Sequence, residues 1–261
     1  MKKITSVQNH FIKSLILLRE KPRARRENSQ FLIEGEREIN LAINGGYTIE
    51  IILFYPKIYP HEKAQELSGK SEIIEINKEV FNKLAYRKST GGVIAIAMSK
   101  DLGLSKLKLS DNSLILIAEA TEKPGNIGAL LRTADAANLD AVIIANPKCD
   151  IYNPNVIRSS VGCIFTNQII VCDSKDIIHF LKENNIKLFC ASLQNSNSYN
   201  NQNYKKSTAI VVGNETHGLS DCWLDLGTNI KIPMRGKIDS MNVSVSAAVL
   251  IFEAIRQREF S

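Results

Sequence analysis

The 261-residue sequence has no apolar run long enough to cross a membrane, which argues against a membrane-spanning protein. It begins Met-Lys-Lys-Ile-Thr-Ser, without an apolar secretion signal, and its five cysteines form no CxxC pair. We therefore expect reduced thiols and a cytoplasmic protein. Its four histidines are scattered without metal-ligand spacing, so we expect no metal. No GxGxxG follows the first strand of the predicted second domain, which disfavours a dinucleotide-dependent oxidoreductase.

The net charge of +6 is unevenly distributed along the chain. Residues 1–100 contain 17 Lys and Arg against 11 Asp and Glu, whereas residues 101–261 contain 16 of each. Within residues 1–26, eight basic residues face a single acid, Glu20. A concentrated basic face is typical of a protein that binds a polyanion, most often nucleic acid. A solvated basic helix is the alternative that charge alone leaves open.

Alternating strand and helix patterns in residues 1–105 predict a small α/β domain. Helical periodicity covers residues 4–20, and a polar break with three arginines follows at 21–28. The polar segment Ser99–Asn112 is the best candidate for a linker to the rest of the chain.

Residues 106–261 predict a second α/β domain with a parallel sheet and helices on both faces. Short apolar runs mark the buried strands: 114–118, 141–145, 168–171, 187–191, 208–213 and 229–232. Helical segments lie between or after them, at 126–138, 174–184 and 242–258. The Asn-rich stretch 194–206 is expected to be an exposed, mobile loop.

Parallel sheets bind ligands beyond the carboxyl ends of their strands, so the loops after the strands are candidate sites. In the loop after the strand at 114–118, Asn126 is placed to cap the next helix. On that helix, Arg132 lies off the apolar stripe. If Arg132 has only a structural role, we expect it to form a surface ion pair with Asp135.

The second loop, Gly213-Asn-Glu-Thr-His-Gly-Leu219, initially suggests a phosphate loop. Leu219 stands where that loop needs lysine, which argues against a nucleoside triphosphatase. Gly213 ends a buried strand, and its missing side chain would let the backbone approach a ligand. Glu215 would lie at the carboxyl edge of the sheet, either in a site or as a capping acid.

The third loop follows the strand that ends at Ile232, where Pro233 stops ladder pairing. Ser240 and Asn242 precede the last helix, and either could be its N-terminal cap. That helix opens with only small or β-branched residues from 243 to 248. Its first turns can therefore press against another backbone or a flat ligand.

Together, the three loops resemble the signature motifs of the SpoU (TrmH-type) branch of the SPOUT RNA methyltransferases. The first resembles Asn-x-Gly-x-x-x-Arg-Thr-Ala, and the second resembles Gly-Asn-Glu-x-x-Gly-Leu. The third resembles Ile-Pro-Met-x-Gly-x-x-x-Ser-Leu-Asn-Val-Ser, with Met241 replacing leucine and keeping an apolar wall. The resemblance covers residues 114–261, while residues 1–100 resemble the substrate-binding extension of the family.

The resemblance implies a basic RNA substrate-binding α/β domain over residues 1–105. It further implies a parallel-sheet SPOUT catalytic domain with a deep trefoil knot over residues 106–261. The implied protein is a homodimer that transfers a methyl group from S-adenosylmethionine to a ribose 2′-hydroxyl in RNA. The N-terminal extension favours ribosomal RNA of the 23S type. Transfer RNA as the substrate, or a catalytically silent RNA-binding protein, are the alternatives.

The same resemblance assigns the site residues. The catalytic residues would be Asn126, Arg132, Glu215, Ser240 and Asn242. The cofactor would contact Leu193, Gly213, Asn214, Gly218, Ile232, Met234, Met241 and Val243. Candidates for phosphate contacts in RNA are Lys13, Arg19, Arg23, Arg25 and Arg26. The family's arginine is proposed as a general base, but a guanidinium stays protonated far above neutral pH. A phosphate contact, or stabilisation of a developing alkoxide, suits Arg132 at least as well.

Overall fold

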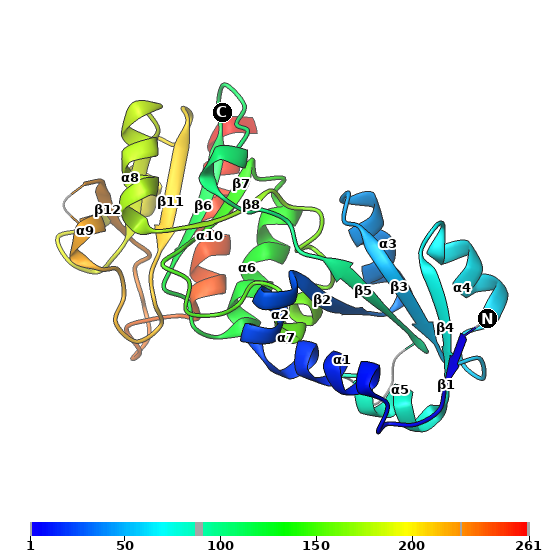
Figure 1. The fold of residues 1–261 in the computed structure, drawn as a ribbon. Coiled ribbons are helices and arrows are strands. Elements are labelled where there is room, and N and C mark those ends of the chain that lie inside the picture. Colours follow the sequence, from blue (N-terminus) through cyan, green and yellow to red (C-terminus); the bar gives the residue numbers. More distant parts are fainter. Residues whose placement is uncertain (1, 87–90, 225, 260–261) are drawn as a thin grey trace. The chain divides into compact units, whose positions relative to one another are not determined.

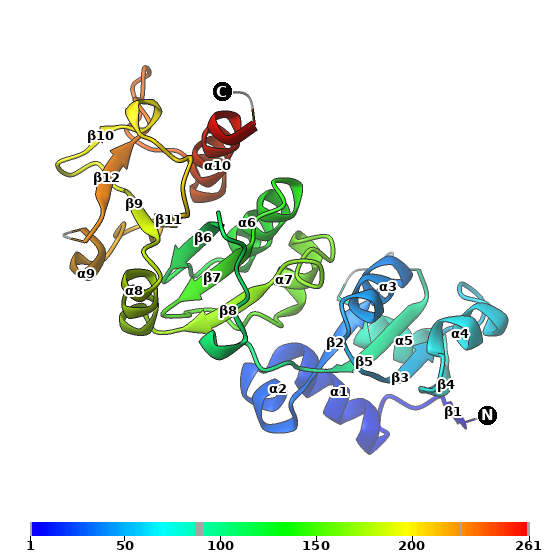
Figure 2. The same cartoon turned by 90° about the horizontal axis from the view of Figure 1, so that it is seen from above.

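The computed structural model describes residues 2–86, 91–224 and 226–259, which form two compact units (Figures 1 and 2). The first unit comprises residues 1–100 and 150–166, and the second comprises residues 101–149 and 167–261. The domain boundary between residues 105 and 106 stays a prediction. The segment 150–166, which the sequence analysis placed in the second domain, packs with the first unit. Among the described residues, no helix combines the length and apolar character needed to span a bilayer.

The first unit is built on a mixed five-stranded sheet of order β1-β4-β3-β5-β2. Its strands are β1 (Lys2–Ile4), β2 (Gln30–Glu34), β3 (Ile49–Phe54), β4 (Glu72–Ile76) and β5 (Val93–Met98). Its helices are α1 (His10–Glu20), α2 (Pro22–Asn28), α3 (Glu36–Asn44), α4 (His61–Ser68), α5 (Lys78–Leu84) and α7 (Pro154–Ser159). β4 is parallel to β1 and β3, whereas β5 is antiparallel to both of its neighbours.

Two sequence predictions for the N-terminus were wrong. Residues 2–4 pair with β4 as a strand, and α1 begins only at His10, where the Asn9 side chain accepts the Phe11 N–H at 2.9 Å. The predicted polar break at 21–28 contains helix α2, which starts with proline at its first position. Proline is pre-organised for a helix start and arginine is a good helix former, so polarity alone misled the prediction.

The second unit contains a seven-stranded sheet of order β10-β12-β9-β11-β6-β7-β8, in which every pair is parallel. The strands are β6 (Leu114–Glu119), β7 (Ala141–Ala145), β8 (Ile169–Cys172), β9 (Lys187–Ala191), β10 (Asn197–Ser198), β11 (Thr208–Val212) and β12 (Thr228–Lys231). The helices are α6 (Pro124–Ala136), α8 (Ser174–Glu183), α9 (Asp221–Leu224) and α10 (Val243–Glu259).

Helices cover both faces of this sheet, as predicted. On one face α8 buries Ile177 and Leu181 in the same apolar cluster as Trp223 of α9. On the other face α6 and α10 pack against each other (Figure 2). Burial on both faces explains why the central strands read as continuous apolar runs.

The Asn-rich stretch is more structured than predicted. It contains β10, which pairs with β12, and a short 3₁₀ helix at Tyr199–Asn201. Tyr204 in the same stretch is fully buried, and its hydroxyl donates to the Tyr199 carbonyl at 2.8 Å. These elements, like α7, α9 and a 3₁₀ turn at Leu104–Lys106 in the predicted linker, are too short to show periodicity.

Candidate active site

One chain of side-chain hydrogen bonds joins the three sequence loops. The Asn242 amide donates from Nδ2 to Asn126 Oδ1 at 3.1 Å. Asn126 in turn donates from its own Nδ2 to Glu215 Oε1. The three residues are far apart in the sequence, so only the fold brings them together. The structure thus brings together one polar side chain from each of the three loops.

Asn126 can take part because it does not cap its helix. The helix α6 begins at Pro124 with Lys123 at the cap position, and no side chain makes a capping bond there. The predicted capping role of Asn126 was therefore wrong. Asn126 lies in the first turn, where its side-chain amide can donate and accept towards the neighbouring loops.

The loop after β11 is a tight turn closed on itself. Asn214 and Gly218 exchange two backbone hydrogen bonds, of 3.0 and 2.9 Å. A Cβ on Gly213 would lie 2.3 Å from the carbonyl carbon of Gly218. Gly213 thus makes room for the loop itself, and its contact with a ligand stays a prediction. The Asn214 amide donates to the Ala120 carbonyl at 3.0 Å and fastens this turn to the first loop.

Glu119 also fixes this turn, and sequence reasoning missed its role. It is 2% exposed, and its carboxylate accepts the Ser220 N–H at 2.9 Å and the Ser220 hydroxyl at 2.5 Å. On its other side, Asn146 and Ser174 donate to the same carboxylate at 3.4 Å. The sequence feature that could have indicated this role is an acidic residue at the end of an otherwise apolar strand. A buried carboxylate needs several donors, and here it joins the ends of three strands.

The third loop leads into α10 through Asn242. Its Oδ1 accepts the Ser244 N–H at 2.9 Å, so Asn242 caps α10, one of the two caps that the sequence allowed. Ser240 is exposed and its hydroxyl donates to Asp239 at 3.2 Å. It takes part neither in the cap nor in the hydrogen bonds that join the loops.

Arg132 is exposed on α6 and forms no hydrogen bond or ion pair with any described residue. The structural alternative, an ion pair with Asp135, does not form. The guanidinium is therefore available to a ligand. No described contact joins Arg132 to the chain of hydrogen bonds between the loops.

Four of the predicted cofactor residues lie in or next to an open segment after β12. From Met234 to Met241, no backbone N–H donates a hydrogen bond to a described residue. A Cβ on Gly236 would meet no atom within 4 Å, so space is open beside it. Ile238 in this segment is 71% exposed, and Leu193, a predicted contact that follows β9, is 60% exposed. The predicted contacts Ile232, Met234, Met241 and Val243 are half-buried.

The predicted phosphate contacts in the first unit differ in exposure. Lys13, Arg23 and Arg26 are exposed, with Arg23 paired to Glu27 at 2.6 Å. Arg19 is half-buried and donates to the Lys83 carbonyl at 2.6 Å.

Arg25 has a structural role instead of the predicted one. It is 3% exposed, with its Nε 2.5 Å from Asp150 Oδ2. Its Nη1 donates to the carbonyl of Leu18 at 2.6 Å. Buried in this way, Arg25 links α2 to α1 and to the segment 150–166, and it is not exposed to a phosphate.

Comparison with known proteins found two matching family models and several similar proteins. A model of the SpoU rRNA methylase family matches residues 113–252, and a model of the MRM3-like substrate-binding domain matches residues 9–95. The chain is 28% identical over 254 residues to the 23S rRNA (guanosine(2553)-2′-O)-methyltransferase RlmP of Bacillus subtilis, which covers 97% of this chain and 98% of that protein.

Solved structures share the fold over the full length. A crystal structure of an RNA 2′-O ribose methyltransferase is 38% identical, covers 98% of both chains and has a TM-score of 0.84. The SpoU methyltransferase AviRb from Streptomyces viridochromogenes, in complex with AdoMet, is 25% identical with a TM-score of 0.89. That match covers 96% of this chain and 98% of AviRb.

Proposed function

Because the chain belongs to the SpoU rRNA methylase family, we propose that it transfers the methyl group of S-adenosylmethionine to a ribose 2′-hydroxyl of 23S-type ribosomal RNA. The observation that carries this proposal is the hydrogen-bonded chain Asn242–Asn126–Glu215, which brings one polar residue from each motif to one place. The relatives support the substrate, since RlmP is named as a 23S rRNA methyltransferase. Family membership further implies the trefoil knot in the second unit.

The open segment after β12 fits S-adenosylmethionine. A flat adenine ring needs apolar walls and backbone groups that are free to hydrogen-bond. Leu193 and Ile238 offer exposed apolar surface, and the backbone N–H groups from Met234 to Met241 lack acceptors among the described residues. Gly213, Asn214 and Gly218 serve this site indirectly, because their contacts shape the adjoining turn.

Bound S-adenosylmethionine supplies a methyl group on a cationic sulfur, and its leaving group departs neutral. The residues of the chain must then align the ribose and lower the cost of deprotonating its hydroxyl. One oxygen of Glu215 is occupied by Asn126, and the other accepts no hydrogen bond from a described residue. That second oxygen accepts the ribose hydroxyl and orients it.

Arg132 supplies positive charge to the reaction. Its guanidinium has no partner among the described residues and can face the alkoxide that develops on the ribose, or the adjacent phosphate. Ser240, exposed beside the capping Asn242, completes the ribose side of the site.

The first unit binds the RNA backbone in this proposal. Lys13, Arg23 and Arg26 are exposed on α1 and α2, where they can contact phosphates. Such contacts position the RNA without reading its sequence. Arg19 adds a weaker contact, because a backbone carbonyl and Glu20 already occupy its guanidinium.

We also propose that the protein is a cytoplasmic homodimer. Val245 and Phe252 lie two turns apart on α10, and each is 48% exposed. An apolar stripe of this kind on a helix supports a contact with a second copy of the chain. The five cysteines are thiols, which supports a reducing compartment. Sedimentation of the purified protein tests the dimer.

Two measurements test the function. Calorimetry should detect binding of S-adenosylmethionine by the purified protein, and absence of binding would overturn the proposal. Tritium from labelled cofactor should then appear in 23S RNA from a strain that lacks the gene, at ribose 2′-oxygens. Transfer to transfer RNA alone would replace the proposed substrate. Cofactor binding without transfer to any RNA would favour a catalytically silent RNA-binding protein.

A further inference from the structure

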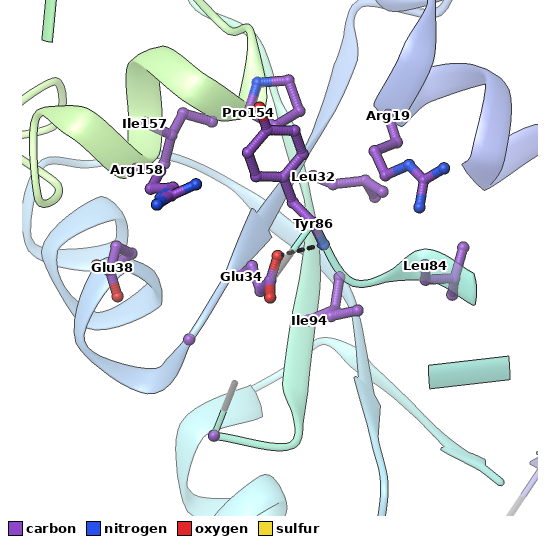
Figure 3. A pocket seen from close by; sticks show the side chains of 12 residues that line it. Arg19, Leu32, Glu34, Glu38, Leu84, Tyr86, Ile94, Pro154, Ile157 and Arg158 are labelled. Carbon is purple, nitrogen blue, oxygen red and sulfur yellow. Dashed lines mark hydrogen bonds between the residues drawn. The ribbon is translucent and has the colours of Figure 1, made fainter. Parts of the chain in front are cut away.

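The first unit contains a cavity of about 160 Å³ whose lining residues all belong to that unit (Figure 3). Apolar side chains from β2, α5 and β5 contribute to its walls: Leu32, Leu84 and Ile94. Ligand pockets for drug-sized molecules usually measure roughly 300–1,000 Å³. This cavity therefore has room for a single ring system and not for a whole nucleotide cofactor.

Tyr86 presents an aromatic ring at this cavity. The residue is 45% exposed, although its backbone N–H is held by Glu34 Oε2 at 2.7 Å. Figure 3 shows the ring between Arg158 and Arg19, with the Glu34 carboxylate below it. An exposed ring on a fixed backbone is a stacking surface, and RNA-binding proteins use such rings for unstacked bases.

Arg158 supplies an available cation next to this ring. It is exposed in the last turn of α7, and its guanidinium carbon lies 5.9 Å from the centroid of the Tyr86 ring. The guanidinium forms no hydrogen bond or ion pair with a described residue. Arg19, across the cavity, is instead occupied by the Lys83 carbonyl and Glu20. Arg158 is thus the better placed of the two to bind a phosphate.

Glu38 gives the cavity an acceptor. Gly35, at a φ of 101°, leaves space for it, since a Cβ there would lie 2.8 Å from Glu38 Oε2. Glu38 is half-buried and has no hydrogen bond or ion pair with a described residue. An ionised carboxylate only accepts hydrogen bonds, so it favours base edges that carry amino groups and disfavours the two carbonyl oxygens of uracil.

We propose that this cavity binds one unstacked nucleotide of the RNA substrate. Its base stacks on Tyr86, its phosphate contacts Arg158, and an amino-bearing edge of adenine, cytosine or guanine faces Glu38. This inference rests on the proposed function and deepens it. Phosphate contacts alone carry no sequence information, whereas one base held in a pocket selects where on a large RNA the enzyme binds.

The first test is steady-state methylation of 23S RNA from a strain lacking the gene. Replacing Tyr86 by Leu keeps an apolar side chain but removes the ring, and KM for RNA should rise about tenfold with kcat within twofold. Tyr86→Phe keeps the ring and should behave as wild type. Thermal unfolding followed by circular dichroism reports whether each variant is folded, and we expect the same unfolding midpoint as wild type. An unchanged KM in the folded Tyr86→Leu variant would overturn the proposal.

The second test identifies the nucleotide by chemical probing of base edges in the bound RNA. Wild-type protein should protect one base that becomes reactive in complexes with Tyr86→Leu. Arg158→Ala should raise KM severalfold, whereas Lys63→Ala, which removes an exposed cation on α4, should not. Protection of a uridine would contradict the role given to Glu38, as would an unchanged KM in Glu38→Gln.

These outcomes distinguish a failure of the pocket proposal from a failure of the proposed function. If wild-type protein methylates 23S RNA and the Tyr86→Leu variant has the same KM and the same protected bases, the pocket proposal fails alone. If wild-type protein binds the cofactor but methylates no RNA, the proposed function fails. Binding of 23S RNA, measured by filter retention, then still tests the pocket, because loss of affinity in Tyr86→Leu does not depend on turnover.

Discussion

Asn242 caps helix α10 with one side-chain atom and contacts Asn126 with the other. Its Oδ1 accepts the Ser244 N–H at 2.9 Å, and its Nδ2 donates to Asn126 Oδ1 at 3.1 Å. The start of α10 is thereby tied to the first turn of α6, 116 residues earlier in the chain. These two roles can be tested separately with a substitution that keeps a capping oxygen and removes the amide donor.

The Asn242→Ser variant should separate the cap from catalysis. Serine is a good N-cap, so the free energy of unfolding should change by less than about 0.5 kcal/mol. Methyl transfer should nevertheless fall strongly, because the amide that positions Asn126 is lost. Asn242→Ala should lose activity and also about 1 kcal/mol of stability. Urea unfolding and tritium transfer measure the two effects, and full activity in Asn242→Ser would contradict the positioning role.

Arg132→Ala should abolish methyl transfer without destabilising the protein. The guanidinium is exposed and makes no hydrogen bond or ion pair with a described residue, so its loss removes no polar structural interaction. Removal of a group that stabilises developing charge typically costs about 10²–10³ in kcat. Arg132→Lys retains charge without the fork of donors and should be intermediate. Single-turnover assays and thermal unfolding provide the readouts, and near-normal turnover in Arg132→Ala would rule out the role.

The sequence predicted the second unit well because its signals are local. Parallel strands buried on both faces appear as apolar runs, and the three motif loops follow three of them. Sequence spacing also placed Asn126, Glu215 and Asn242 in those loops. That they form one chain of hydrogen bonds could not be predicted, since it depends on the packing of α6 against α10.

Other features escaped prediction because they depend on distant partners. Arg25 looked like Arg23 and Arg26 in a basic segment, but Asp150, 125 residues away, makes it a buried residue. Glu119 looked like a strand end, and its role depends on Ser220 in another loop. Local sequence periodicity predicts which face of its own helix or strand a charged residue occupies. It does not predict burial of that residue by a partner that is distant in the sequence.

Arg25 and Arg26 form a matched pair for testing this distinction. Removing one partner of a buried ion pair costs about 3–5 kcal/mol, so Arg25→Ala should strongly destabilise the protein. Arg26→Ala should leave stability unchanged and weaken binding to 23S RNA, because Arg26 is exposed. Urea unfolding and filter binding are the measurements. Equal stability of the two variants would show that the contact between Arg25 and Asp150 contributes little.

Glu119→Ala should lower both the stability and the methyl-transfer activity of the protein. The change leaves the partly buried N–H and hydroxyl of Ser220 without their acceptor. An unsatisfied group costs about 1–3 kcal/mol when it is fully buried, so we expect a smaller loss for each of these two donors. The turn that carries Glu215 also loses a support. Glu119→Gln retains one acceptor and should show a smaller loss in both measurements. If Glu119→Ala unfolds at room temperature, the Gln variant still tests the link through kcat at unchanged affinity for S-adenosylmethionine.

Asp140 should make the stability of the second unit depend on pH. Burial would raise the pKa of this carboxyl, but hydrogen bonds from Ser110 and Leu114 and the nearby Arg258 outweigh burial and lower the pKa. Ionised Asp140 therefore stabilises the fold above its ordinary pKa of about 4. The contribution disappears as the pH falls through the lower pKa of the folded state.

The Asp140→Asn variant should therefore be less stable than wild type at pH 7, by about 1 kcal/mol. The difference should shrink as the pH falls below about 4, where the wild-type carboxylate takes up its proton. Urea unfolding of both proteins between pH 7 and pH 3 measures this, with Asp111→Asn as the control at an exposed acid nearby. A stability difference that stays constant over that range would mean that the charge on Asp140 does not stabilise the fold.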